Sequence, residues 1–158
     1  MKVKTSRFGE IEVPDSSLIS FPDGVVGLRE NKRFVIFDCG DDGVLKWLQS
    51  ADDPEIAFVI CEAKTIAATY NIALSDKELE LLKAKSTLEL LICLILTIPE
   101  NPYDMTANML GPLCFNPDQR IGIQLVLINP EFSTRHRVFL PGSDTKAPPP
   151  APARKGGK

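Results

Sequence analysis

Most of the chain consists of short apolar runs, each ended by a turn signal. Residues 2–13 alternate around Val3, Ile11 and Val13 before the polar stretch 14–17, which predicts an edge or hairpin strand. Residues 33–38 and 55–61 carry apolar side chains at both odd and even positions, a pattern typical of strands that are covered on both faces. These runs favour a β protein.

The remaining strand candidates are separated by short polar turns. Glycines at 40 and 43 precede a short amphipathic piece, residues 44–48, which carries Trp47. Three further strands are predicted at residues 111–116, 121–128 and 135–140, joined by Asn-Pro turns. Because the connections are short, we expect antiparallel neighbours.

Only one helix has a clear start signal. Ser75 and Glu78 form a capping-box pattern ahead of apolar residues at helical spacing. Residues 88–98 are rich in leucine, which favours helix locally, but their end in Ile95-Leu96-Thr97-Ile98-Pro99 favours strand, and we assign a buried strand. The pattern therefore predicts a mainly β fold, a small antiparallel barrel or sandwich; we expect a barrel-like single domain with one or two short helices.

Composition sets the limits of that domain. The segment 141–158 has no large apolar side chain and is rich in Pro, Ala, Gly and Lys, so we expect residues 1–140 to fold and 141–158 to be a disordered tail. The apolar run 88–98 is far shorter than the roughly 18 residues that a membrane helix needs, and no secretory h-region follows Met1. We expect a cytoplasmic protein with no membrane association.

Acidic side chains are concentrated between residues 38 and 62, where Lys46 is the only base. Such a patch repels nucleic acid and attracts basic partners, so we expect no direct nucleic-acid binding. The alternative is that acids in turns simply keep the protein soluble. The acids of this segment are Asp38, Asp41, Asp42, Asp52, Asp53, Glu55 and Glu62.

The sequence offers no recognisable catalytic or metal-binding constellation. Its four cysteines contain no C-x-x-C pair, and its one histidine, His136, lies between two arginines that disfavour its protonated form. The cysteines fit better as small buried apolar residues. We therefore expect no metal, no cofactor and no enzymatic activity, while a small-ligand or enzymatic β-barrel stays open as the alternative because many buried strands can enclose a cavity.

Several segments, taken in order, resemble the FliW family over residues 3–140. The resemblance implies a flagellar assembly factor of mainly β structure. Most of its motifs read as fold determinants: residues 21–24 as a turn, Gly27 as a positive-φ position, and Asn108 with Pro112 as the end of a short helical turn before a strand. The segments that carry it are Arg7-Phe8-Gly9, residues 19–28, Trp47-Leu48-Gln49-Ser50-Ala51-Asp52-Asp53-Pro54 with Ala57-Phe58, Ala68-Thr69-Tyr70, and residues 97–99, 105–112 and 122–127.

Protein contacts are predicted in the polar stretch after Trp47. Gln49, Ser50, Asp52 and Asp53 read as turn residues that contribute little to a core, which makes them the preferred contact residues. Two acids of the neighbouring turn complete the candidate set, Asp41 and Asp42.

The resemblance also implies partners. A FliW protein binds flagellin and, once flagellin is exported, binds the RNA-binding repressor CsrA and relieves its repression of flagellin translation. The acidic segment agrees with this because an RNA-binding protein presents a basic surface. Flagellin is expected to dock an apolar helical end in a groove that the sequence does not locate. We expect a monomer when the protein is free; a general acidic scaffold with another basic partner is a further alternative.

Overall fold

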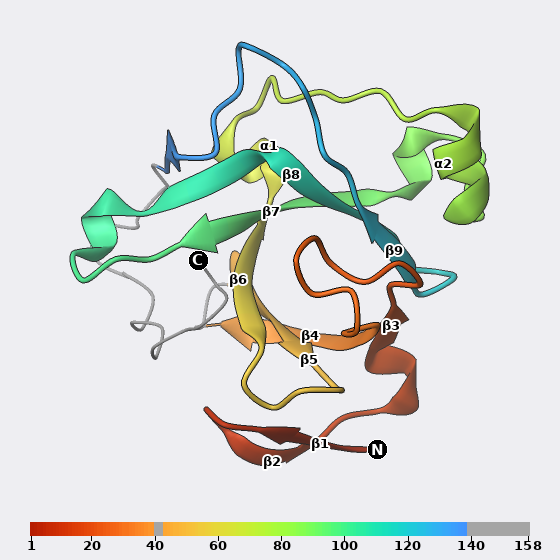
Figure 1. Cartoon of the computed structure of the whole chain (residues 1–158), viewed down its shortest axis with the longest axis vertical. Helices are drawn as coiled ribbons and strands as arrows, with labels where there is room; N and C mark the ends of the chain where they lie inside the picture. The colour runs from red at the N-terminus through yellow and green to blue at the C-terminus, as the bar shows by residue number, and fades with distance from the viewer. Residues whose placement is uncertain (40–42, 139–158) are drawn as a thin grey trace.

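The computed structural model describes residues 1–39 and 43–138, and most of them belong to one sheet (Figure 1). Its strand order is β10-β8-β7-β6-β5-β4-β3-β9, and an additional pairing of β8 with β9 closes seven of the strands into a barrel. The predicted barrel-like, mainly β fold is confirmed. The strands are β3 Leu18–Ser20, β4 Arg33–Cys39, β5 Leu45–Ser50, β6 Ala57–Glu62, β7 Leu91–Thr97, β8 Thr106–Asn116, β9 Ile121–Gln124 and β10 His136–Arg137.

The first residues form a hairpin of their own, β1 (Lys2–Thr5) paired with β2 (Gly9–Glu12). Its turn gives the Arg7-Phe8-Gly9 motif a packing role: the Arg7 guanidinium carbon lies 4.2 Å from the centre of the Trp47 ring, and the Phe8 ring meets the same indole edge-on at 5.6 Å. Ser6 N–H also donates to the Pro54 carbonyl at 2.9 Å. The hairpin therefore packs against β5 and the turn that follows it.

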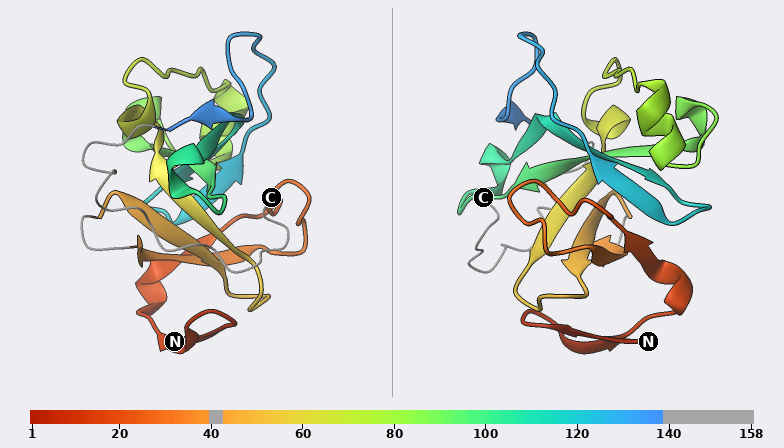
Figure 2. Two further views of the ribbon diagram at one scale, coloured as in Figure 1. Left: turned by 90° about the vertical axis from the view of Figure 1, so that its left-hand side faces the viewer. Right: turned by 45° about the vertical axis from the view of Figure 1, so that its right-hand side comes forward.

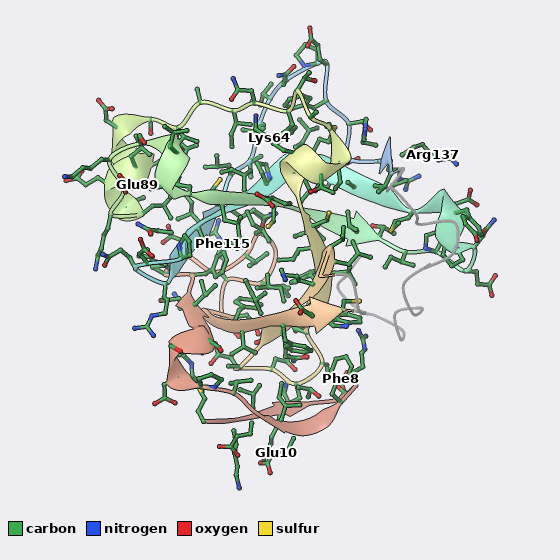
Figure 3. All side chains as sticks on the ribbon, turned by 180° about the vertical axis from the view of Figure 1, so that it is seen from behind. Phe8, Glu10, Lys64, Glu89, Phe115 and Arg137 are labelled. Atoms are coloured by element: carbon green, nitrogen blue, oxygen red, sulfur yellow. The ribbon has the colours of Figure 1, made fainter. Side chains whose placement is uncertain are left out.

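Strands β4 and β6 are buried on both faces, as their sequence pattern predicts, and β5, predicted as a short amphipathic piece, is buried on both faces as well. One face packs in a cluster around Trp47, Val59 and Leu94, and the other around Phe21 and Phe115, the latter inside the barrel (Figure 3). Burial on both sides is possible because the sheet curves around the second cluster while the hairpin and later segments cover the first.

The barrel closes where β3 meets β9 in parallel at Ser20 and Ile121. This closure requires Gly122, because a Cβ there would lie 2.8 Å from the Phe21 ring. Phe21 is fully buried and meets Phe34 and Phe115 edge-on at 5.4 and 6.0 Å. The turn at residues 21–24 and the positive φ of Gly27 are confirmed, with φ +84 at Gly27 and a Gly24 N–H to Phe21 carbonyl bond of 2.8 Å.

Two short helices, α1 (Ala63–Ile66) and α2 (Asp76–Leu81), lie on one side of the barrel, as the two views of Figure 2 show. Ser75 and Glu78 form the predicted capping box at α2. The assignment of 88–98 as a strand is confirmed over β7, although Thr87–Glu89 is a 3-10 turn capped by Ser86. Pairing with β6 on one side and β8 on the other outweighs the helical preference of leucine.

The expectation of a helical turn around Asn108 and Pro112 is wrong, because β8 runs through both residues. The turn-like residues instead mark an irregularity: Cys93 pairs with Leu113, but Ile95 pairs with Asn108, so several residues of β8 bulge against β7. Asn108 Oδ1 accepts from Leu110 N–H at 2.9 Å within this bulge. A proline is tolerated there because its missing N–H removes no regular ladder bond.

The last predicted strands are shorter than expected, and β9 covers only residues 121–124 of the predicted strand 121–128. Of residues 135–140 only His136–Arg137 forms a strand, and 139–140 lie outside the described residues. The predicted tail, 141–158, and the predicted contact residues Asp41 and Asp42 lie outside them as well. Across the described part of the chain, no helix is both long enough and apolar enough to cross a membrane.

Candidate protein-binding surfaces

Gln49 is not a turn residue: it belongs to β5 and is fully buried. Its Nε2 donates to the carbonyls of Ser50, Pro54 and Ile56 at 3.0, 3.3 and 3.2 Å. These carbonyls come from the turn that follows the strand, and buried carbonyls need hydrogen-bond donors. Gln49 therefore braces the turn from inside, and the expectation that it contributes little to the core is wrong.

Ser50 holds the same turn from its other side and is also fully buried. Its hydroxyl donates to Asn31 Oδ1 at 2.6 Å and accepts from the N–H groups of Asp52 and Asp53 at 3.0 and 2.9 Å. A side chain with all its hydrogen-bonding capacity used in this way has no surface to offer a partner. The expectation that the side chain contributes little to the core is wrong for Ser50 too.

Asp52 lies at the surface, but its carboxylate is bound by the chain itself. It accepts from the N–H groups of Lys32 and Arg33 at 2.9 and 3.0 Å, and forms a two-point pair with the Arg33 guanidinium at 2.9 and 2.8 Å. Partial burial alone would raise the pKa of the Asp52 carboxyl, but these hydrogen bonds outweigh it and lower the pKa below its usual value. Asp52 ties β4 to the turn.

Asp53 is the candidate in this turn whose carboxylate has a single local contact, accepting from Glu55 N–H at 3.0 Å through Oδ1. We name residues 49–56 the braced turn. Of the four contact residues predicted here, the structure brings all four together, and it gives two of them a buried structural role.

The acidic segment does not form one patch in the described residues. Asp38 pairs in register with Lys46 near one end of β5 and bonds it at 2.6 Å, whereas Asp52 follows the other end. Glu62, at the end of β6, lies at the same end of the sheet as Asp38. A six-residue strand separates the two groups by roughly 20 Å. Acids that are close together in the sequence therefore lie at opposite ends of the strand. Counting charges along the sequence does not reveal this separation.

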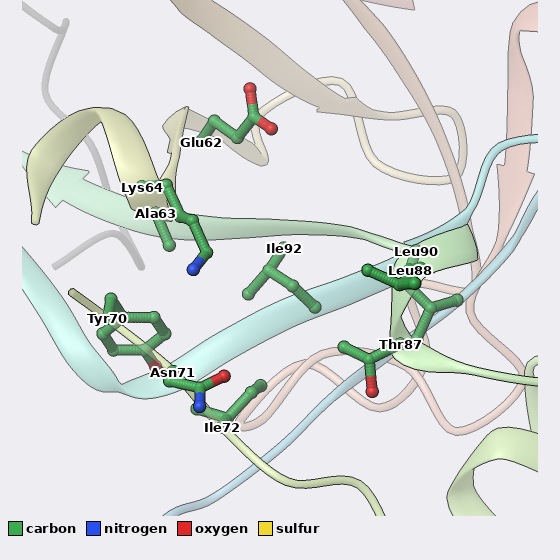
Figure 4. A pocket seen from close by; sticks show the side chains of 10 residues that line it. All are labelled: Glu62, Ala63, Lys64, Tyr70, Asn71, Ile72, Thr87, Leu88, Leu90 and Ile92. Carbon is green, nitrogen blue, oxygen red and sulfur yellow. The ribbon is translucent and has the colours of Figure 1, made fainter. Parts of the chain in front are cut away.

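Beside Glu62 lies an open cavity of about 330 Å³ (Figure 4). It is bounded by the junction of β6 with α1, by the segment after Tyr70, and by the start of β7. Leu88 stands at its rim and is 96% exposed. We name this cavity the Glu62 groove; its lining residues are Glu62, Ala63, Lys64, Tyr70, Asn71, Ile72, Thr87, Leu88, Leu90 and Ile92.

Tyr70 forms a fixed wall of the Glu62 groove. Its hydroxyl donates to the Met109 carbonyl at 2.9 Å, and its ring stacks on Phe132 with centroids 4.9 Å apart. Burial, together with nearby Cys114, raises the pKa of Tyr70 well above its usual value, so the hydroxyl stays protonated. The wall is apolar and rigid, which suits packing rather than proton transfer.

A second cavity, of about 320 Å³, also borders Glu62, and the core residues Ile60 and Phe115 are among those that line it. Glu62 lines both cavities and is itself exposed. A partner that spans this region would therefore meet the apolar walls of two cavities beside one carboxylate. Sequence reasoning missed the groove because its residues come from three separate segments.

The four cysteines are buried, as predicted, and form no disulfide with one another. Burial raises the pKa values of Cys93 and Cys114 to about 12, so both stay protonated thiols. Within the described ranges no three metal-ligating side chains gather at one place. This agrees with a packing role for the cysteines.

The fold and these surfaces define the class of protein: a small closed β-barrel that carries apolar cavities on its outside. The family model described as FliW protein matches residues 2–138. The flagellar assembly factor FliW of Geotalea uraniireducens is 37% identical over 139 residues, covering 88% of this chain and 85% of that protein. That of Geobacter sulfurreducens is 36% identical over 148 residues, covering 94% and 92%.

A solved structure agrees with the sequence relatives. The crystal structure of a flagellar assembly factor FliW superposes with a TM-score of 0.80 at 32% identity, covering 89% of this chain and 99% of that one. The chain belongs to the FliW family of flagellar assembly factors.

Proposed function

We propose that this chain binds flagellin and, when free of it, binds CsrA and relieves the repression of flagellin translation. The observation that carries the proposal is the Glu62 groove, an open apolar cavity on a protein of the flagellar assembly factor family.

Flagellin docks in the Glu62 groove through an apolar helical end. An amphipathic helix places side chains at i, i+3 or i+4 and i+7 into such a groove. Leu88 at the rim and Leu90 and Ile92 along one wall offer the apolar contacts. Tyr70, fixed by Met109 and Phe132, keeps the opposite wall in place without a conformational change.

CsrA is recognised by acids on the surface. The internal bonds of Gln49, Ser50 and Asp52 leave Asp53 as the candidate of the braced turn that can meet a basic side chain. Asp41 and Asp42, which were predicted from the sequence, stay in the proposal as contact residues for CsrA. Rim charges of this kind mainly raise association rate and selectivity, and they are screened by salt.

Titration calorimetry with purified flagellin and purified CsrA tests the proposal, using two single variants. Leu88→Lys places a charge in the groove at a position whose exposure leaves folding unaffected, so flagellin binding should weaken by at least about tenfold, which is about 1.4 kcal/mol. Asp53→Lys should weaken CsrA binding, and more so at low salt than at moderate salt.

Two matched variants serve as controls. Leu81→Lys adds the same charge at another exposed leucine outside the groove, and Glu80→Lys makes the same change of sign at an exposed acid on α2. Both should bind both partners as the parent does. The proposal fails if the unmodified chain binds neither flagellin nor CsrA.

A further inference from the structure

The segment 121–128 has one paired edge and one open edge. Beyond the ladder of β9 with β8, Leu125 N–H donates to the Pro112 carbonyl at 2.9 Å and Leu127 N–H to the Leu110 carbonyl at 2.8 Å. Because backbone groups alternate in direction along an antiparallel strand, those of Gln124, Val126 and Ile128 point away from β8.

On that outer side the backbone groups of these three residues have no hydrogen-bond partner in residues 1–39 and 43–138. In the same described ranges, β3 pairs with β9 at the single position Ser20–Ile121, so it does not reach them. We name the outer side of residues 124–128 the open edge. An unpaired edge of this kind is a template for another strand.

Two apolar side chains of the open edge, Val126 and Ile128, face the solvent. Val126 is 71% exposed and Ile128 is 98% exposed, whereas Leu125 before them is buried and Leu127 between them is half-buried. Core packing accounts for the inward side chains of this segment. It does not account for the two exposed β-branched side chains. A strand placed alongside would cover both.

A cleft of about 540 Å³ lies at the start of the open edge, between β9 and the loop of residues 22–29, which run side by side in Figures 1 and 2. Val26 N–H donates to Gln124 Oε1 at 2.8 Å and holds the loop at this distance. Two bases, Arg29 and Lys32, and one acid, Asp23, line the cleft. Its excess of positive charge favours an acidic residue on whatever enters.

We propose that the open edge binds an extended segment of a protein partner as an added strand, with apolar side chains over Val126 and Ile128 and an acidic residue in the cleft beside Arg29. An extended backbone is required because the outward groups recur at every second residue, a spacing that a helix does not match. This surface is distinct from the Glu62 groove and does not depend on flagellin or CsrA.

The test uses the full chain and a fluorescent synthetic peptide of alternating threonine and valine that ends in two glutamates. Anisotropy titration should show saturable binding, and amide exchange should slow at Val126 and Ile128 when peptide is added. Val126→Pro removes an outward N–H and should weaken binding at least about tenfold, while Val126→Thr keeps the N–H and should bind as the parent does.

Changes in the peptide keep the test decisive if Val126→Pro disturbs the fold. N-methylation of alternate peptide residues should abolish binding with the protein unchanged, and lysines in place of the glutamates should weaken it. No binding, or binding that survives both backbone changes, overturns the proposal. It is also overturned if sedimentation shows that the parent dimerises and Val126→Pro does not, because the occupant is then a second copy of the chain.

Discussion

The braced turn and the segment 121–128 reverse the usual reading of polar and apolar residues. In the braced turn, Gln49 and Ser50 are polar yet fully buried: Gln49 Nε2 donates to backbone carbonyls, and the Ser50 hydroxyl accepts from backbone N–H groups. In the segment 121–128, Val126 and Ile128 are apolar yet exposed beside backbone groups without partners in the described chain. Backbone hydrogen bonding explains both exceptions.

The comparison teaches where binding is to be sought in this protein. A turn whose polar groups are satisfied internally is stable and offers little to a partner. Apolar side chains at the surface stay in contact with water until a partner covers them. The Glu62 groove and the open edge meet the second description, and most of the braced turn meets the first.

The largest effect on stability is expected from a substitution in the core beneath the segment 121–128. Phe21→Ala removes a fully buried ring that contacts Phe34 and Phe115 and lies under Gly122, so it should lower the free energy of unfolding by about 3–5 kcal/mol. Urea unfolding followed by circular dichroism measures it. A loss below about 1 kcal/mol would show that the barrel closure does not depend on this ring.

The next largest effect on stability is expected in the braced turn. Ser50→Ala leaves Asn31 and the amides of Asp52 and Asp53 without their partner, which should cost about 1–3 kcal/mol in urea unfolding. Ser16→Ala, at an exposed serine before β3, is the matched control and should change little. Equal effects of the two variants would contradict the bracing role.

A pH dependence should accompany the braced turn. Since the pKa of the Asp52 carboxyl is lowered on folding, its contribution to stability is fully present above the unfolded pKa and is lost as the pH falls through the folded pKa. Urea unfolding midpoints of the parent and Asp52→Asn should therefore differ at pH 6, and the difference should shrink only as the pH falls below the unfolded pKa of about 3.9 and through the lower folded pKa. Asp118→Asn, at an exposed acid, should show no such pH dependence.

The smallest effect is expected on the open edge. Ile128→Ser changes a side chain that is 98% exposed, so stability should stay within about 0.5 kcal/mol of the parent. Thermal unfolding measures this. A loss of several kcal/mol would mean that Ile128 packs against the fold and that the edge is not open.

Much of the fold could be predicted because its strands carry local signals. Runs of apolar residues at both odd and even positions identified β4 and β6, the capping box located α2, and short turns implied antiparallel pairing. The bulge in β8 could not be predicted, since Asn108 and Pro112 have the same local preferences in a bulge as at a helix end. Likewise, the parallel closure of β3 on β9 joins residues about a hundred positions apart and leaves no local trace.

The candidate surfaces were less predictable. The sequence marks Gln49 and Ser50 by their polarity, but their burial depends on carbonyls of Pro54 and Ile56 that fold back over them. The Glu62 groove combines segments around residues 62, 70 and 88, which only the folded barrel brings together. A leucine at position 88 gives no sign in the sequence that it is exposed.

Hydrogen exchange of the full chain, alone and saturated with flagellin, tests the central claim most directly. The proposed docking in the Glu62 groove predicts slower exchange of the amides of Tyr70, Asn71, Leu88 and Leu90, which line it, with the amides of the braced turn unchanged. Slower exchange confined to the braced turn, with the groove unaffected, would contradict the account.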